Sequence, residues 1–278
     1  MVYLILAIVS SALVSLTMRA SEKKVKNNIS MLAANYLMCL LLGGLYTGEA
    51  GLFPAAEGLN AALLLGAISG VFYLASFMLL QWNIRVNGVV LPATFMKLGV
   101  LVPTLLAVVV FHETPRVTQV IGFALAIAAI VLIRAEKGRG KAKNAWGLLV
   151  LLVMGGLTDA LSKIYEVYGA AALNGQYLFY TFVAAFVLCV ALAAVKKQTI
   201  TWTEAGLGLL LGLPNYFSAR FLLLSLSSVP AVAAFPTYSV ATIVLVTLSG
   251  MVFFAERLSR RQMLALGVIL CALVLLNC

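Results

Sequence analysis

The stretch LPATFMKLGVLVPTLLAVVVF, residues 91–111, carries a single charge, Lys97, in a run that is otherwise apolar apart from two threonines. A transmembrane helix needs about 20 predominantly apolar residues, so this stretch is long enough to cross a bilayer. Similar runs lie on both sides of it, and 63% of the 278 residues are apolar while only 10% are charged. Soluble domains are roughly half apolar and a quarter charged, which excludes an ordinary globular enzyme.

Apolar runs bounded by charges and turn residues predict ten membrane-spanning helices. They cover residues 2–18, 29–46, 61–81, 88–111, 117–133, 146–168, 177–195, 204–226, 230–254 and 262–276. The longest connection between them is too short to hold a soluble domain. We therefore predict an all-α membrane protein, because hydrocarbon offers exposed backbone groups no partner and no segment alternates as a barrel strand would.

Lys and Arg residues concentrate in alternate connections. The odd-numbered connections hold fifteen of them, whereas the even-numbered connections hold only Arg116 and Lys163. Under the positive-inside rule, this asymmetry predicts that the odd connections are cytoplasmic and that both termini lie outside. Topology thus accounts for the net charge of +10, and no nucleic-acid partner is expected. We expect a multi-pass protein in the lipid bilayer of a bacterial inner membrane.

The chain also repeats itself. At an offset of 143, residues 88–133 align with residues 231–276, and polar residues match as well as apolar ones, for example Glu113 with Glu256. Because each repeat holds five spans, an odd number, the two copies must enter the membrane in opposite directions. Inverted repeats are a transporter architecture, with the substrate site near the midplane between the halves.

These boundaries define the predicted domains. A first five-helix repeat covers residues 1–133, a basic cytoplasmic linker covers 134–145, and a second five-helix repeat covers 146–278. The fold class is therefore an all-α membrane protein of ten transmembrane helices, arranged as two inverted repeats.

Three segments carry a family resemblance. YLASFMLLQ (73–81), FHE (111–113) and FFAERLSRRQMLALGVILCALVLL (253–276) resemble the repeat of the drug/metabolite transporter superfamily, in its EamA-like branch. The resemblance covers nearly the whole chain as two copies and implies a ten-helix secondary transporter. The small multidrug resistance exporters resemble one such repeat without its fifth helix.

Charged residues inside the spans are the first candidates for a binding site, because each costs about 2.5–3.5 kcal/mol at the centre of a membrane helix. Lys97 lies roughly 15 Å along its helix, near the midplane. We predict that it binds substrate, or else that it is a structural ammonium capped by backbone carbonyls. Asp159 lies roughly 20 Å along the sixth span and is predicted to bind substrate or a coupling proton. Lys163, four residues later, either shares that coupling role or neutralises Asp159.

Arg220 lies roughly 24 Å along the eighth span, where it either binds a carboxylate or phosphate with its planar fork or snorkels to the interface. The resemblance implies that Asp159 occupies the helix in which small multidrug exporters carry their essential glutamate. It also implies that Lys97 replaces a tryptophan that stacks on cationic drugs. With Lys97 and Arg220 against Asp159, the cavity is predicted to be net positive and to prefer anionic groups.

The remaining predicted lining is aromatic, hydroxyl and amide, all of which also serve in packing. These residues are Tyr36, Tyr180, Tyr238, Thr94, Asn35, Gln81 and Asn215. Glu113 and Glu256 close matching helices of the two halves and are expected to be structural, holding Arg116 and Arg257.

No GxxxxGK, HExxH or GxSxG motif occurs, which removes ATP-driven pumping and the commonest intramembrane hydrolases. The four cysteines lack metal-ligand spacing, so neither a cofactor nor a metal is expected. The leading hypothesis is a secondary transporter of a small anionic or zwitterionic metabolite, such as an amino acid or a phosphorylated acid, working by alternating access. The alternatives are a proton-coupled exporter of cationic drugs and a non-transporting scaffold or sensor. The oligomeric state stays open, and a monomer is plausible.

Overall fold

The computed structural model describes residues 1–47, 51–102, 116–134, 143–226, 229 and 231–276, and all regular secondary structure within them is helical. The helices are α1 (Val2–Ser21), α2 (Asn28–Leu45), α3 (Leu59–Asn87), α4 (Val90–Lys97), the 3-10 turn η1 (Leu98–Val100), α6 (Val117–Arg134), α7 (Ala145–Tyr168), the 3-10 turn η2 (Ala171–Leu173), α8 (Asn174–Val195), α9 (Trp202–Leu226), α10 (Ala231–Phe254) and α11 (Arg260–Leu276).

Nine of the ten predicted spans coincide with a described helix, and the fourth, 88–111, is described only to residue 102, where it holds α4 and η1. Seven of the described helices are long and apolar enough to cross a membrane, and two shorter apolar segments, Val90–Val100 and Val120–Ala129, accompany them. The chain is thus an all-helical, multi-pass membrane protein. Helix α3 runs six residues beyond the predicted end and stops at Gly88, whose φ of +79° is a conformation that glycine adopts without strain.

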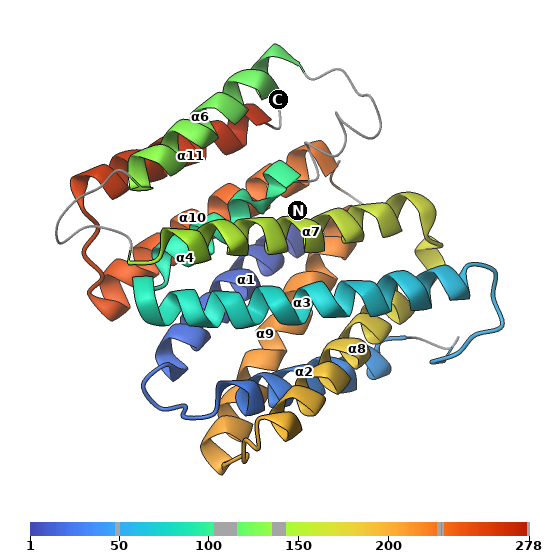
Figure 1. The fold of residues 1–278 in the computed structure, drawn as a ribbon. Coiled ribbons are helices and arrows are strands. Elements are labelled where there is room, and N and C mark those ends of the chain that lie inside the picture. The colour runs from blue at the N-terminus through green and yellow to red at the C-terminus, as the bar shows by residue number, and fades with distance from the viewer. Residues whose placement is uncertain (48–50, 103–115, 135–142, 227–228, 230, 277–278) are drawn as a thin grey trace.

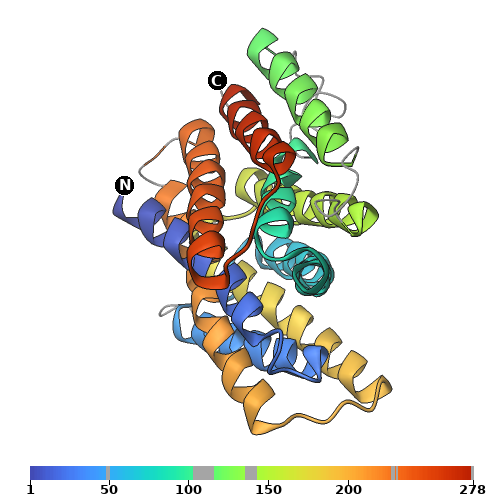
Figure 2. The ribbon, with the colours of Figure 1, turned by 90° about the vertical axis from the view of Figure 1, so that its left-hand side faces the viewer.

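Helix contacts in the two halves correspond when α1, α2, α3, α4 and α6 are exchanged for α7, α8, α9, α10 and α11. Helix α1 packs on α9 as α7 packs on α3, α2 packs on α9 as α8 packs on α3, and α4 packs on α7 as α10 packs on α1. Equivalent helices also contact each other, α2 with α8, α4 with α10 and α6 with α11. Figures 1 and 2 show α6 and α11 side by side at one end of the molecule, with α2, α8 and α9 at the opposite end.

Two equivalent helix crossings depend on glycine. A Cβ atom on Gly70 of α3 would lie 2.5 Å from the carbonyl oxygen of Thr181 in α8, and one on Gly212 of α9 would lie 2.6 Å from that of Asn35 in α2. Each glycine follows another four residues earlier, Gly66 or Gly208, which also faces the partner backbone. Small residues at this spacing let membrane helices approach closely, so van der Waals packing replaces the absent hydrophobic drive.

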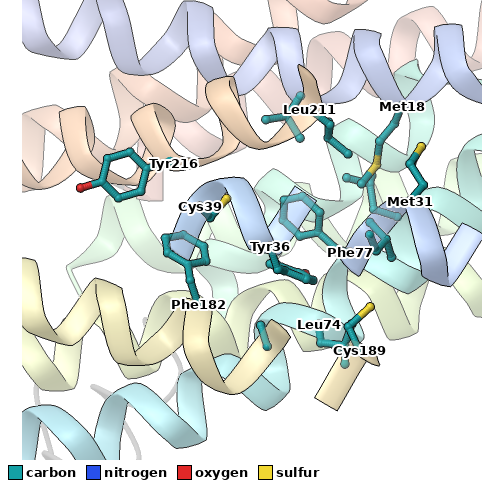
Figure 3. Packing of buried hydrophobic residues seen from close by; sticks show 14 of the residues in the cluster. Met18, Met31, Tyr36, Cys39, Leu74, Phe77, Phe182, Cys189, Leu211 and Tyr216 are labelled. Atoms are coloured by element: carbon teal, nitrogen blue, oxygen red, sulfur yellow. The ribbon is translucent and has the colours of Figure 1, made fainter. Parts of the chain in front are cut away.

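A cluster of buried aromatic and apolar residues fills the space between α2, α3, α8 and α9. Figure 3 shows Tyr36, Cys39, Phe77 and Phe182 gathered in it. The rings of Tyr36 and Phe77 have centroids 6.1 Å apart, and the Tyr36 hydroxyl donates to the backbone carbonyl of Tyr73 at 3.2 Å. This cluster fixes α3, which carries part of the cavity described below.

Hydrogen bonds between connections sort into two ends. At one end, Asn27 donates to the carbonyl of Thr199 at 2.7 Å, and the amide of Lys143 donates to Asn87 at 2.9 Å. These bonds join odd-numbered connections. At the other end, Gln176 in the first turn of α8 donates to the carbonyl of Thr47 at 3.2 Å, which ties α8 to an even-numbered connection.

Glu256 joins the two halves at the first end. Its carboxylate accepts from the backbone amides of Val89 and Val90 at 2.8 and 3.3 Å, at the start of α4, and pairs with Arg19 at 3.2 Å. The prediction that Glu256 holds Arg257 is therefore wrong. An anion at a helix N-terminus satisfies unpaired amide groups, and here the second half supplies it to a helix of the first. Glu113 lies outside the described residues.

Candidate functional site

A cavity of about 140 Å³ opens between helices of both halves. An apolar protein cavity of about 150 Å³ holds a benzene molecule, so the volume suits one small solute. Seven helices line it, namely α1, α3, α4, α7, α8, α9 and α10. Eleven lining residues carry a hydroxyl: Ser11, Ser15, Tyr73, Ser76, Thr158, Ser162, Tyr177, Thr181, Ser218, Tyr238 and Thr242. Among the lining residues that the structure describes, two are charged, Lys97 and Asp159.

Helical spacing aims these hydroxyls at one place. Residues three or four apart lie on the same face of a helix, and the hydroxyls of α1, α7, α8 and α10 follow that spacing. Thr158 donates to the carbonyl of Met154 at 2.9 Å, and Thr181 to that of Tyr177 at 2.8 Å. Such bonds to the preceding turn satisfy a hydroxyl locally, so serine and threonine are tolerated inside a membrane helix.

Lys97 stands where the α-helical part of α4 ends. The 3-10 turn Leu98–Val100 follows it directly, and a Cβ on Gly99 would lie 2.6 Å from the backbone nitrogen of Gly156 in α7. This close approach brings the end of α4 against α7. The Lys97 ammonium lies 3.8 Å from the centroid of the Tyr238 ring, a cation–π contact.

Asp159 is exposed although it lies well inside α7, because it borders the cavity and not a packed neighbour. Among the described residues, the ion pairs with a nitrogen–oxygen distance within 4.0 Å are those of Arg19, so Lys97 and Asp159 share one cavity without direct contact. The side chain of Lys163 lies outside the described part. The predicted pairing of Asp159 with Lys163 thus stays a prediction.

Equivalent positions of the two halves line the cavity. Four lining residues of α3 correspond to four of α9 at an offset of 142: Tyr73, Ser76, Phe77 and Leu80 with Asn215, Ser218, Ala219 and Leu222. Three of α1 correspond to three of α7 at an offset of 144: Ser11, Val14 and Ser15 with Gly155, Thr158 and Asp159. The described lining of the cavity therefore comes from both halves of the chain. Helix α8 breaks the correspondence, since it contributes lining residues and α2 does not.

Comparison with known proteins supports a transporter. Residues 175–269 match the family described as Small Multidrug Resistance protein. An uncharacterized protein of Haemophilus influenzae is 24% identical over 276 residues, covering 95% of this chain and 93% of its own. A crystal structure of a protein shares the fold, with a TM-score of 0.64 over 99% of this chain and 94% of that chain, at 15% identity.

The matched family is one of membrane transporters and not of enzymes. The matched residues span α8, α9, α10 and most of α11, which include Tyr238 and Asn215 of the cavity. They begin after Asp159 and Lys97, so the match carries no information on the two charged residues. The comparisons support a membrane transporter of small molecules and leave its substrate class unassigned.

The structure brings four of the predicted site residues to the cavity: Lys97, Asp159, Tyr238 and Asn215. Apart from Lys163, whose side chain is outside the described part, the other predicted residues lie outside the lining. Tyr180 donates to the carbonyl of Leu52 at 2.6 Å, and Thr94 to that of Val90 at 2.8 Å. Asn35 supports the wall from behind, accepting from Asn215 at 3.1 Å. Tyr36 belongs to the buried cluster, and Gln81 is buried but does not border the cavity.

Arg220 lies apart from the cavity. Its guanidinium is 4.0 Å from the centroid of the Tyr46 ring and donates to the Tyr216 hydroxyl at 3.3 Å, near the C-terminal end of α2. The expectation of a net positive cavity is therefore wrong for the described lining, which carries one cation and one anion. The aromatic residues Tyr46 and Tyr216 fix the direction of the Arg220 side chain. We call these two charged groups, Lys97 and Asp159, the poles of the cavity.

Ten polar lining residues were not predicted: Ser11, Ser15, Tyr73, Ser76, Thr158, Ser162, Tyr177, Thr181, Ser218 and Thr242. A hydroxyl costs little inside a helix that can bond it locally, so none of these residues stands out alone. Only the spacing of several hydroxyl residues taken together could have revealed them. Hydroxyls recur three or four residues apart within one helix, and one pair, Ser76 and Ser218, also stands at equivalent positions of the two halves.

Proposed function

We propose that this protein is a ten-span secondary transporter of a small zwitterionic or anionic metabolite. The observation that carries the proposal is the pair of unlike charges, Lys97 and Asp159, facing one hydroxyl-lined cavity without contacting each other. A substrate that bears a carboxylate or phosphate and an amino group would bridge them. The desolvation that such charges cost within the membrane is offset when a complementary substrate pairs with both.

The architecture supports alternating access between two inverted repeats of the EamA-like kind. Helix contacts that match on exchange of the halves, and lining positions that correspond at offsets of 142 and 144, support a pseudo-two-fold relation centred on the cavity. Midplane sites between repeats are reached from either side by rocking one half against the other. We further propose that the basic, odd-numbered end is cytoplasmic in a bacterial inner membrane, with Asp159 able to carry a coupling proton.

Binding by the purified protein tests the two poles. A thermal-shift panel in detergent would compare L-threonine, succinate, glucose 6-phosphate and tetramethylammonium, since a ligand that binds only the folded state raises the melting temperature. Lys97→Met should weaken binding of carboxylate or phosphate ligands about ten- to hundred-fold, the value of a charge-assisted hydrogen bond. Lys196→Met, which removes an exposed cation outside the cavity, is the matched control. Unchanged affinity in Lys97→Met would refute the assignment.

A second candidate is an exporter of cationic drugs, which the match to the small multidrug resistance family favours. In that case Asp159 would be the main ligand, and Lys97 would repel the substrate. Lys97→Met then separates the two candidates, because it changes ligand affinity in opposite directions. Lys97→Met should raise the affinity for tetramethylammonium in a cation exporter and lower that for L-threonine in a zwitterion transporter.

A further inference from the structure

The Lys97 ammonium and the Asp159 carboxylate stay apart although both border one small cavity. Lys97 sits on a flexible four-carbon stem at the end of a helix, and such a stem has many rotamers. Opposite charges attract strongly in a site of low dielectric, so an unrestrained Lys97 would move towards Asp159. A described contact that holds its ammonium elsewhere is the face of the Tyr238 ring, 3.8 Å from the nitrogen to the centroid.

Tyr238 is itself held in place. Its hydroxyl and that of Ser218 are 3.0 Å apart, which ties α10 to α9, and both residues are buried. A ring fixed at its far end presents a rigid face to α4 across the cavity. A cation–π contact uses the face of the ring and leaves ammonium N–H groups free to donate to a ligand.

We propose that Tyr238 is a positioning residue that holds Lys97 away from Asp159, so that the cavity keeps two separate charged poles. This role rests on the proposed function in one respect: the separated ammonium is the group that would receive the anionic end of a substrate. Without the ring, the ammonium and the carboxylate would pair with each other. A zwitterionic substrate would then have to displace that pair in order to bind.

Stability measurements without substrate test this role. The coupling between Lys97 and Asp159 is obtained from a double-mutant cycle of Lys97→Met and Asp159→Asn, measured as a ratio of unfolding constants in a detergent titration. In the native background we expect a ratio below about two. In Tyr238→Leu, the pair forms and the ratio should rise to about five or more, which is within the range of contacting charged residues.

Tyr238→Phe separates the ring from its anchor, because it keeps the ring and removes only the hydroxyl that meets Ser218. Its ratio should therefore lie between the native value and that of Tyr238→Leu. A role in packing alone would not change the coupling between two other residues, so an equal ratio in Tyr238→Leu and native protein overturns the proposal. Should Tyr238→Leu fail to fold, Tyr238→Met preserves apolar volume without a ring and carries the same expectation. The result does not depend on whether Lys97→Met alters ligand binding, so the two proposals can fail separately.

Discussion

Gly70→Ala is expected to destabilise the protein because the added methyl group meets the backbone of α8. The new Cβ would lie 2.5 Å from the Thr181 carbonyl oxygen and 2.7 Å from the Ala184 Cβ. Carbon atoms in contact prefer separations of about 3.5–4.0 Å, so α3 and α8 must part by about 1 Å. Overpacking of this kind costs about 1–3 kcal/mol.

Helix propensity acts in the opposite direction, since alanine is favoured over glycine by about 1 kcal/mol in a helix interior. Gly267 of α11 provides the control, because it is exposed and a Cβ there meets nothing within 4 Å. The difference between Gly267→Ala and Gly70→Ala cancels the propensity and should equal the overpacking cost, about 1–3 kcal/mol.

Equilibrium unfolding by sodium dodecyl sulfate in mixed micelles, followed by circular dichroism, measures this difference. Gly212→Ala should resemble Gly70→Ala, because its Cβ would lie 2.5 Å from the Met38 Cβ at the equivalent crossing. Equal stabilities of Gly70→Ala and Gly267→Ala would refute the close crossing. Separation of α3 from α8 would also shift Tyr73, which borders the cavity three residues later.

Three further variants test contacts around the site. Glu256→Gln removes the charge that pairs with Arg19 and should lower the free energy of unfolding by about 1–2 kcal/mol in the same titration; an unchanged midpoint would exclude a stabilising pair. Asn215→Leu leaves the buried Asn35 amide without its described partner and should cost about 1–3 kcal/mol, with Asn35→Leu added to it costing less than the sum. Tyr36→Phe should cost about 0.5–1.5 kcal/mol through one lost hydrogen bond and leave ligand affinity unchanged; weakened binding would place Tyr36 in the site.

The helices were predictable because membrane insertion depends mainly on length and hydrophobicity. The positions of Lys97 and Asp159 at a cavity follow from the same physics, since a charge within a span needs water or a partner. The place of Arg220 could not be predicted in this way. Depth along α9 is a property of one helix, but its contact with Tyr46 depends on how α2 packs against α9, and no local pattern encodes that packing.

The hydroxyl lining shows a different limit. The Thr158 hydroxyl is bonded within its own helix and the Ser218 hydroxyl to Tyr238 of α10, so their place in the cavity depends on how the helices pack. The lining by α8 was not predictable from the relation between the two halves either. Its equivalent α2 does not border the cavity, so the asymmetry arises from side-chain packing and not from topology.

Transport itself tests the central claim most directly. Uptake of labelled L-threonine, succinate and glucose 6-phosphate into proteoliposomes would be compared for native protein, Lys97→Met and Asp159→Asn. The account predicts saturable uptake of a zwitterionic or anionic solute by native protein, at least about ten-fold weaker in Lys97→Met, in keeping with one lost charge-assisted hydrogen bond. Asp159→Asn should reduce uptake of a zwitterion in the same way. Saturable uptake of such a solute that neither substitution alters would contradict the account.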